Sequence, residues 1–204
     1  MNTGLLRPPL RQLRELKPHS FIFEQTGALP AFLCDDMVAR FEQNQADHYA
    51  GRIGQNRGSD TSIKKTTDLF ISGSDKPHWQ DADRNLHRSL ALALREFRET
   101  YPFFQGPFKD MGYNLQRYQP GEYYHWHVDG GSHDFADRQL VALWYLNDVP
   151  VEAGGTTDFL HQGVRVQPEK GKLVLFPPFW THEHRASVLI NKTKYIATTW
   201  VLFA

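Results

Sequence analysis

Two segments in the first half of the chain carry apolar residues at the spacing of an amphipathic helix. In the range 34–47 this face is short and consists of Met37, Val38 and Phe41, and Asp35 or Asp36 is placed to cap the helix. In the range 81–102 the face is longer and a proline follows it: Leu86, Leu90, Ala93, Leu94, Phe97. The sequence therefore predicts two helices that each pack one face against a core.

From residue 112 onward the pattern changes to short apolar or alternating runs separated by glycine and proline turns. Short strands at this spacing are typical of an antiparallel barrel or sandwich. The runs are 113–118, 140–147, 163–168, 172–177 and 195–203. We therefore expect a mainly β fold with flanking helices.

The pattern also predicts how the chain is divided. Residues 1–20 form an arm, in which Leu6, Leu10 and Leu13 can lay one face on the body or on a second subunit, so an oligomer is possible. Residues 21–204 form a single domain, with a helical and lid-bearing part over 21–111 and a β core over 112–204. The glycine-containing, basic segment 51–65 is predicted to be a mobile lid. A loosely docked terminus and a surface loop without a role are the alternatives.

Composition narrows the function classes. The 204 residues carry 23 basic and 23 acidic side chains, so no overall field favours nucleic acid or an anionic membrane. The single cysteine, Cys34, excludes an intrachain disulfide and a cysteine-based zinc site. We see no signal peptide or apolar run of membrane-spanning length, and expect a reducing, cytoplasmic location.

The stretch "YYHWHVDGG" places three metal-capable side chains at alternate positions. If it is a strand, His125, His127 and Asp129 point to one face, and the two glycines that follow allow a bend. Imidazole and carboxylate together suit Fe(II), Zn or Mn. Because an isolated His-x-Asp is more often a polar strand face, a third ligand elsewhere in the chain is needed to support a metal site.

The C-terminal segment supplies candidates for that ligand and for an anion anchor. His182 and His184 follow an apolar run and a Pro-Pro turn. On the last expected strand, alternation puts one lysine on the face that enters the barrel, and a lysine there requires an anion. The residues of this face are Lys194, Ile196, Thr198 and Trp200.

At these residues the chain resembles the Fe(II)/2-oxoglutarate dioxygenases of the prolyl 4-hydroxylase type, in their bacterial or phage forms. "YQPGEYYHWHVD" matches the family pattern Tyr-x-x-Gly-x-x-Tyr-x-x-His-x-Asp through Tyr118, Gly121, Tyr124, His127 and Asp129. The segments "WYLND", "EAGGTTDF", "KGKLVLFPPFWTH" and "KYIATTW" follow in the order of the family. The resemblance covers residues 112–202 and implies a double-stranded β-helix, or jelly roll.

The resemblance also implies the site. Fe(II) is expected on His127, Asp129 and a distal histidine, for which "FPPFWTH" favours His182, although the spacing to the lysine suits His184 better. The cosubstrate 2-oxoglutarate is expected to pair with Lys194. Its other expected neighbours are Tyr118, Tyr145 and Thr198. The extra His125 is read as a supporting or surface residue.

The implied activity is hydroxylation of a C–H bond, with 2-oxoglutarate, Fe(II) and dioxygen, and with ascorbate as an accessory reductant. The substrate is expected to be a prolyl residue in a peptide or protein, or else a small molecule such as a free amino acid. Asp129 argues against a halogenase, and the absence of a net positive charge argues against nucleic-acid dealkylation. A silent jelly-roll binding module and a zinc hydrolase are the remaining alternatives, and both leave Lys194 unexplained.

Overall fold

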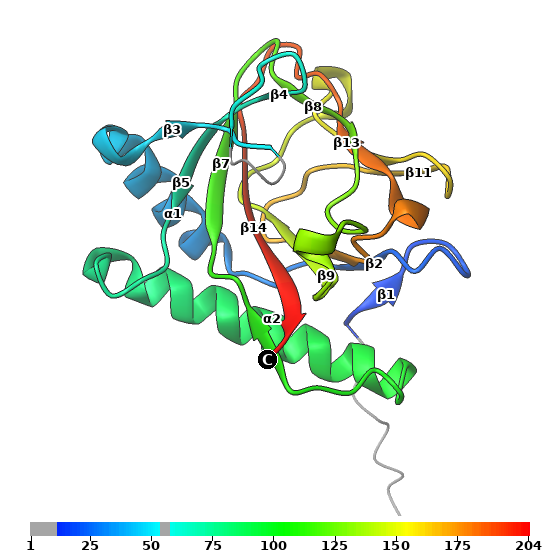
Figure 1. The fold of residues 1–204 in the computed structure, drawn as a ribbon. Coiled ribbons are helices and arrows are strands. Elements are labelled where there is room, and N and C mark those ends of the chain that lie inside the picture. The colour runs from blue at the N-terminus through cyan, green and yellow to red at the C-terminus, as the bar shows by residue number, and fades with distance from the viewer. Residues whose placement is uncertain (1–11, 54–57) are drawn as a thin grey trace, which may run out of the picture.

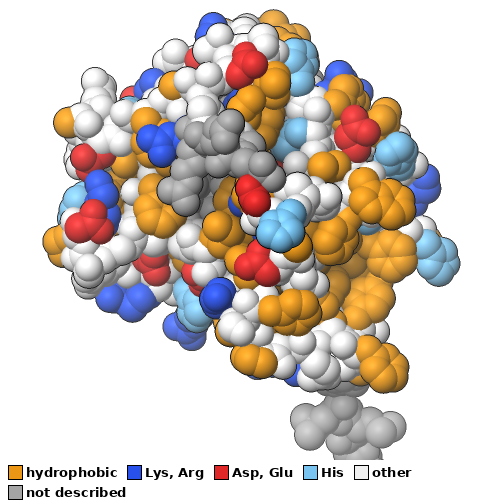
Figure 2. Space-filling view, viewed as in Figure 1, with side chains coloured by type: hydrophobic (Ala, Val, Ile, Leu, Met, Phe, Trp, Pro, Cys, Tyr) orange, Lys and Arg blue, Asp and Glu red, His pale blue; other side chains and the backbone are white. Residues whose placement is uncertain are grey.

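The computed structural model describes residues 12–53 and 58–204, which form two facing β-sheets with two helices against one of them (Figure 1). The predicted arm lies partly outside these ranges, including Leu6 and Leu10. Leu13, by contrast, is buried in the main core. No helix within the described ranges is long and apolar enough to cross a membrane. Acidic and basic side chains are interspersed over the face seen in Figure 2.

The larger sheet has nine strands, all paired antiparallel. Its order is β1-β2-β12-β9-β14-β7-β5-β3, and β6 pairs with the far end of β14. The bounds are β1 Arg14–Glu15, β2 Phe23–Gln25, β3 Tyr49–Ala50, β5 Thr67–Phe70, β6 Phe108–Asp110, β7 Asn114–Tyr118, β9 Arg138–Tyr145, β12 Leu173–Phe176 and β14 Lys194–Phe203.

The smaller sheet has five strands in the order β11-β10-β13-β8-β4. The bounds are β4 Lys64–Lys65, β8 Tyr123–His127, β10 Thr157–Phe159, β11 Val164–Val166 and β13 His184–Ala186. Short 3-10 turns lie between the strands and next to the helices: η1 Gln45–Asp47, η2 Pro77–Trp79, η3 His133–Phe135, η4 Val151–Ala153 and η5 Trp180–His182.

Helices α1, Ala31–Gln43, and α2, Gln80–Thr100, pack on the outer face of the larger sheet (Figure 1). Both predicted helices are confirmed, and the expected apolar face of α2 is buried except for the partly buried Leu94. The predicted cap of α1 was wrong. The helix begins after Pro30, whose carbonyl accepts the first helical hydrogen bond, so both aspartates lie inside the first turns.

The larger sheet separates two apolar clusters because side chains alternate along each strand. On β14, Ala197 and Val201 face the helices, whereas Ile196 belongs to the cluster between the sheets. The same alternation directs Lys194, Thr198 and Trp200 toward the space between the sheets, as expected from the sequence. One face of this strand therefore stabilises the fold, and the other face builds a cavity.

All five predicted strand runs are confirmed. The sequence missed several other strands of two to four residues, which include β4 and β5 in the first half of the chain. These two strands pair with β8 and β7, so both sheets extend into the region expected to be helical. The division of the domain at residue 112 stays a prediction.

The described part of segment 51–65 is tied to the smaller sheet. Ile53 and Gly58 form an isolated antiparallel bridge, and Lys64 pairs with Tyr124. At Gly51 a Cβ would lie 2.1 Å from Thr66 Oγ1 and 2.9 Å from Lys64 Cε, so any side chain there would displace these two. Residues 54–57 lie outside the described ranges, and the lid stays a prediction.

Leu86→Ala is expected to lower the free energy of unfolding by about 2–5 kcal/mol, because this fully buried side chain joins α2 to the larger sheet. Leu92→Ala on the same helix is the matched control: Leu92 is 44 % exposed, and a change within about 0.5 kcal/mol is expected. Urea unfolding followed by circular dichroism measures both. Equal losses in the two variants would contradict the packing of α2.

Candidate active site

The pairing of β8 with β13 brings two distant histidines together. His127, the last residue of β8, lies directly opposite His184, the first residue of β13, and their ring centroids are 4.2 Å apart. Asp129 follows two residues after His127. Its carboxylate lies 3.8 Å from His127 Nε2 and 3.6 Å from His184 Nε2. One ligand atom from each residue falls within 4.8 Å of the others.

Backbone carbonyls orient both imidazoles. His127 Nδ1 lies 2.7 Å from the carbonyl of His125, and His184 Nδ1 lies 3.0 Å from the carbonyl of His182. Because a carbonyl only accepts, each Nδ1 carries the proton and each Nε2 keeps its lone pair. Both Nε2 lone pairs therefore face Asp129. Histidines that bind a metal through one ring nitrogen have the same arrangement, with the other nitrogen donating to a carbonyl or carboxylate.

The loop after β8 is fixed from two sides. The amides of Asp129 and Gly130 both donate to the carbonyl of Pro178, at 3.1 and 2.8 Å. The carbonyl of Asp129 accepts a hydrogen bond of 2.6 Å from Arg138 Nη1. Gly131 has φ +83°, a conformation that favours glycine, so the expected bend after the histidine stretch is present.

The expectation that His182 is the distal ligand was wrong in this structure, which brings His184 to the other two residues instead. His182 ends the turn η5, and both its ring nitrogens are used elsewhere. Its Nε2 lies 2.9 Å from the carbonyl of Ser20, and its Nδ1 lies 2.8 Å from the hydroxyl of Thr181. Two residues later, the strand β13 turns His184 toward β8.

A second aromatic ring covers His127. Tyr124 stacks on it with a centroid distance of 3.5 Å and an interplanar angle of 12°. Burial, and next the neighbouring His184, lower the pKa of His127 to about 3. The ring is therefore neutral at physiological pH, with its Nε2 lone pair available.

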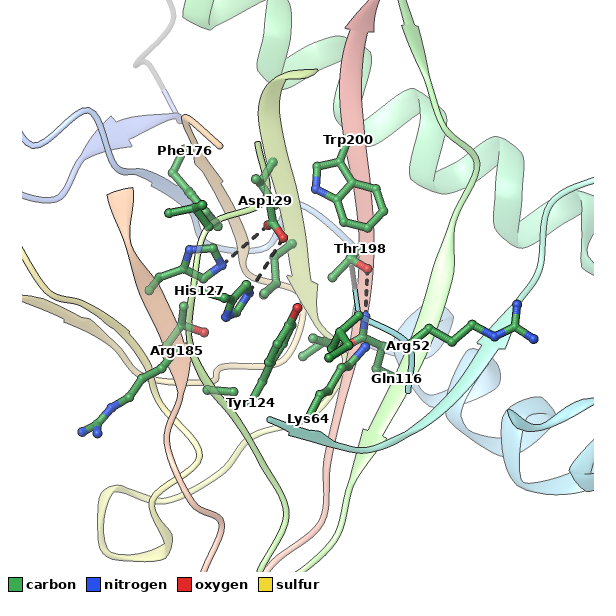
Figure 3. A pocket seen from close by; sticks show the side chains of 18 of the residues that line it. Arg52, Lys64, Gln116, Tyr124, His127, Asp129, Phe176, Arg185, Thr198 and Trp200 are labelled. Atoms are coloured by element: carbon green, nitrogen blue, oxygen red, sulfur yellow. Dashed lines mark hydrogen bonds and ion pairs between the residues drawn. The ribbon is translucent and has the colours of Figure 1, made fainter. Parts of the chain in front are cut away.

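A cavity of about 200 Å³ opens between the two sheets at this cluster (Figure 3). Its floor is apolar, with Val141, Leu143, Phe176 and Ile196, and polar groups enter from the surrounding strands. Figure 3 shows Asp129 between His127 and the β14 side chains Thr198 and Trp200. An enclosed apolar site with a few convergent polar groups is typical of a small-molecule or cosubstrate site.

Lys194 lines the cavity and has no acidic partner within 4.0 Å among residues 12–53 and 58–204. Its side chain is 1 % exposed, Nζ donates to the carbonyl of Gly155 at 2.8 Å, and Nζ lies 4.1 Å from the ring centroid of Tyr118. Burial lowers the pKa of Lys194 to about 7. The charged form of a buried lysine is stabilised when an anion binds next to it, so this position favours an anionic ligand.

Of the other three predicted site residues, two line the cavity and one does not. Tyr118 and Thr198 line the cavity, and Gln116 links them: it accepts from the Tyr118 hydroxyl at 3.2 Å and donates to Thr198 Oγ1 at 3.3 Å. Tyr145 does not line the cavity. Its hydroxyl donates to Thr157 Oγ1 at 2.6 Å, and it is Thr157 that reaches the cavity wall.

Sequence reasoning missed several residues of the cavity wall. Gln116 could have been found, because alternation puts it on the same face of its strand as Tyr118. Lys64 could not have been found, because β4 is two residues long and shows no alternating pattern. Its ammonium group pairs with the buried Asp68 at 2.8 Å. His125 is exposed, and its ring packs on Tyr123 at 4.6 Å, away from the cluster.

The comparisons with known proteins agree with this geometry. Residues 113–202 match the model of the 2OG-Fe(II) oxygenase superfamily. No curated protein matches the sequence significantly. The matched segment begins just before β7 and contains the whole His-Asp-His cluster and Lys194.

Solved structures with the same fold include prolyl hydroxylases. The viral collagen prolyl hydroxylase of Paramecium bursaria Chlorella virus-1, in its 2OG complex, aligns with TM-score 0.68 at 16 % identity over 93 % of this chain and 99 % of that chain. A prolyl-4-hydroxylase of Pseudomonas putida aligns with TM-score 0.68 at 19 % identity over 90 % and 93 %. A Trichoplax adhaerens prolyl hydroxylase, in complex with a hypoxia inducible factor oxygen degradation domain peptide fragment, aligns with TM-score 0.77 at 16 % identity over 90 % and 84 %.

The fold is therefore the jelly roll expected from the sequence, like that of the prolyl hydroxylases, and residues 113–202 match the 2OG-Fe(II) oxygenase superfamily. This match and the His-Asp-His cluster identify the protein as an oxidoreductase, a dioxygenase that uses Fe(II), 2-oxoglutarate and dioxygen.

The two C-terminal histidines have opposite expected effects on metal binding. His184→Ala is expected to weaken Fe(II) or Mn(II) binding at least about a hundredfold, because it removes one of three ligand atoms. His182→Ala is the matched control: it is expected to keep the metal and lose stability, because it frees the buried carbonyl of Ser20. Anaerobic calorimetry measures the affinity. Loss of metal in His182→Ala but not in His184→Ala would contradict the assignment.

Proposed function

We propose that the enzyme hydroxylates an aliphatic C–H bond of a prolyl residue in a peptide or protein, with Fe(II) held by His127, Asp129 and His184. The donor set supports this: two imidazole nitrogens with free lone pairs and one carboxylate suit Fe(II) and leave other positions of the metal open. When bound, Fe(II) and 2-oxoglutarate would supply the electrons that activate dioxygen, so that one oxygen atom enters succinate as CO2 is lost and the other enters the C–H bond.

The observation that carries the proposal is the buried Lys194, which has no acidic partner among the described residues and lies in the same cavity as the His-Asp-His cluster. A dicarboxylate can bind the metal through one end and meet Lys194 with the other. A zinc hydrolase would give this lysine no role. Thr157 and Thr198 add hydroxyl groups to the same wall, and the hydroxyl of Tyr145 fixes Thr157.

The side chains next to the proposed metal and cosubstrate positions have distinct tasks in this proposal. His127 and His184 keep Nε2 free because their Nδ1 protons are donated to carbonyls. Tyr124 and Phe176 pack on the two histidines and exclude water from them. Burial raises the pKa of Tyr118 well above its ordinary value, so its hydroxyl remains a neutral donor beside the cosubstrate.

The proposed peptide substrate rests on the likeness to prolyl hydroxylases, of which one is described in complex with a peptide fragment. Part of the cavity wall comes from the described residues of segment 51–65, which contribute Ile53 and Lys64. A free amino acid is the alternative substrate, because the cavity does not itself distinguish a prolyl residue from proline.

The affinity for 2-oxoglutarate is expected to fall as the pH rises above about 7. Lys194 has a pKa of about 7 in the free enzyme, so above that pH a proton must be taken up before the ammonium can pair with a carboxylate, and affinity drops by up to about tenfold per pH unit. Lys194→Met should bind the cosubstrate about ten- to a hundredfold more weakly at pH 6.5 and lose the pH dependence. Anaerobic calorimetry between pH 6.5 and 9 measures the affinity for 2-oxoglutarate. An affinity of the wild type that does not change with pH would contradict the proposed pairing of Lys194 with the cosubstrate.

The proposed reaction is tested by incubating the enzyme with Fe(II), 2-oxoglutarate, ascorbate and a library of proline-containing peptides in air. We expect succinate, together with a peptide that gains one oxygen atom on proline, located by tandem mass spectrometry. Asp129→Ala is the control and should form neither product. Oxygen incorporation into free amino acids alone would exclude the peptide substrate, and an absence of succinate with every substrate would exclude the oxygenase assignment.

A further inference from the structure

The outward face of α2 carries a row of arginines that neither the core nor the cavity uses. Arg84, Arg88, Arg95 and Arg98 are all exposed. At 3.6 residues per turn these positions, with Ala91 in the middle, fall within one sector of about 80°, so they form a straight row about 20 Å long. This row is called the arginine stripe below. Because α2 packs on the outer face of the larger sheet, the stripe lies on the opposite side of that sheet from the cavity (Figure 1).

The charges of α2 are sorted between two sides of the helix. Its sequence holds four acidic residues and four arginines. Neighbouring segments use three of the acids: Asp81 pairs with an arginine of α1, Asp83 accepts from a serine hydroxyl, and Glu96 accepts from two backbone amides. None of the four arginines forms an ion pair within 4.0 Å among residues 12–53 and 58–204. The outward side of the helix is therefore positive, although the chain as a whole is neutral.

The stripe is unfavourable for the helix that carries it. Arg84 and Arg88 are four positions apart and Arg95 and Arg98 are three apart, and like charges at these spacings repel each other on a helix. A carboxylate that binds between two arginines removes this repulsion, and each guanidinium can hold it with two parallel hydrogen bonds. A local arrangement that costs stability without serving the fold is typical of a functional surface. The stripe is thus suited to an acidic partner.

A groove lies beside the stripe at the C-terminal end of α2. Its volume is about 490 Å³, and α2 and the segment that leads into β6 form its walls. Leu94, Pro102 and Phe108 contribute apolar surface to it, and two arginines of the stripe line the same groove. Next to Pro102, the side chain of Phe103 is 98 % exposed. A ligand that fills this groove therefore contacts apolar groups and arginines at once.

The shape and charge of this face favour a protein segment over other anions. An apolar side chain can fill a groove, whereas the surface of a bilayer is flat and does not enter one. Glu99 also lines the groove and would repel the closely spaced phosphates of a nucleic acid, while a peptide can place its fewer carboxylates away from it. Arginine and aromatic residues around an apolar pocket are the common anchors of protein interfaces, and a groove of this kind accepts an amphipathic helix.

We propose that this face of α2 is a docking surface for an acidic amphipathic segment of a partner protein. An apolar side chain of the segment enters the groove beside Phe108, and its carboxylates pair with Arg95 and Arg98 and, further along the helix, with Arg84 and Arg88. Docking and the reaction in the cavity use opposite sides of the larger sheet, so the inference does not rest on the proposed function.

A peptide library tests the kind of partner without assuming its sequence. Random peptides of about 16 residues, displayed on phage, are selected on the full chain and depleted on a double variant with Arg88→Glu and Arg95→Glu. Only peptides that need the stripe remain. We expect them to be rich in aspartate and glutamate and to carry an apolar residue one helical turn from an acid. Enrichment of neutral or basic peptides, or of no peptide that needs the stripe, would overturn the proposal.

Affinities separate the contributions of charge and groove. The Kd of one enriched peptide is measured by fluorescence anisotropy, together with a version whose acids are amides and a version whose apolar residues are alanine. Each version is expected to bind at least about tenfold more weakly, and the affinity of the parent peptide is expected to fall as salt rises. An alanine version that binds as tightly as the parent would reduce the surface to unspecific charge attraction and overturn the proposal.

Single variants of the chain locate the binding surface. Arg95→Glu and Arg98→Glu are expected to weaken binding of the parent peptide at least about tenfold, and Phe103→Ala severalfold. Lys192→Glu is the matched control. Lys192 is exposed just ahead of β14, whereas β6 pairs with the other end of that strand, so binding should not change. The Tm and the binding of Mn(II) show that each variant is folded. Equal weakening in the control would contradict the location.

The other occupants of such a face are measured in parallel. A single-stranded RNA and vesicles of phosphatidylcholine with phosphatidylserine are titrated at the same salt concentration, and both are expected to bind more weakly than the peptide. Tighter binding of either one that is lost in Arg95→Glu would assign the stripe to nucleic acid or membrane and overturn the proposal. Self-association that is lost in Arg95→Glu, measured by analytical ultracentrifugation, would identify a second copy of the chain as the occupant and overturn it as well.

Discussion

The antiparallel pairing of β8 with β13 is the constraint on which the site depends. It sets His127 opposite His184 across two adjacent strands, 57 positions apart in the sequence. A slip of one residue in this register would turn one of the imidazoles to the other face of the sheet. The carbonyls of His125 and His182 then complete the arrangement, because they take the Nδ1 protons and leave both Nε2 atoms facing Asp129.

The larger sheet links the stability of the fold to the chemistry of the cavity. Its outer face is buried under α2 through residues such as Leu86 and Trp144, and Trp144 also donates to Ser89 Oγ on the helix. Its inner face carries Lys194, a buried cation whose burial the apolar core must offset. The helices thus pack on the outer face of the strand β14 that carries Lys194 on its inner face, although neither helix is among the elements that line the cavity.

Three polar groups in the cavity wall lack a full set of partners among the described residues. Lys194 has only a carbonyl, and Arg138 Nε and Trp200 Nε1 have no acceptor among residues 12–53 and 58–204. Apolar rings such as Phe176 and Tyr124 surround these groups and keep water away. Groups of this kind are costly in the free protein, and their cost becomes selectivity when a ligand with matching oxygens binds.

The sequence by itself determined the parts of the protein that repeat a local pattern. The helical face of 81–102, the alternation that sends Lys194 and Thr198 inward, and the pair His127 and Asp129 all follow from the period of a helix or a strand and from motif order. The tertiary structure decided what depends on pairing between distant segments. His184 rather than His182 joins the His-Asp-His cluster, Tyr145 bonds to Thr157 instead of lining the cavity, and Lys64 and Arg138 enter the cavity wall. These outcomes depend on the register of short strands and on the bonds made by the turns between them, which are not local properties of the chain.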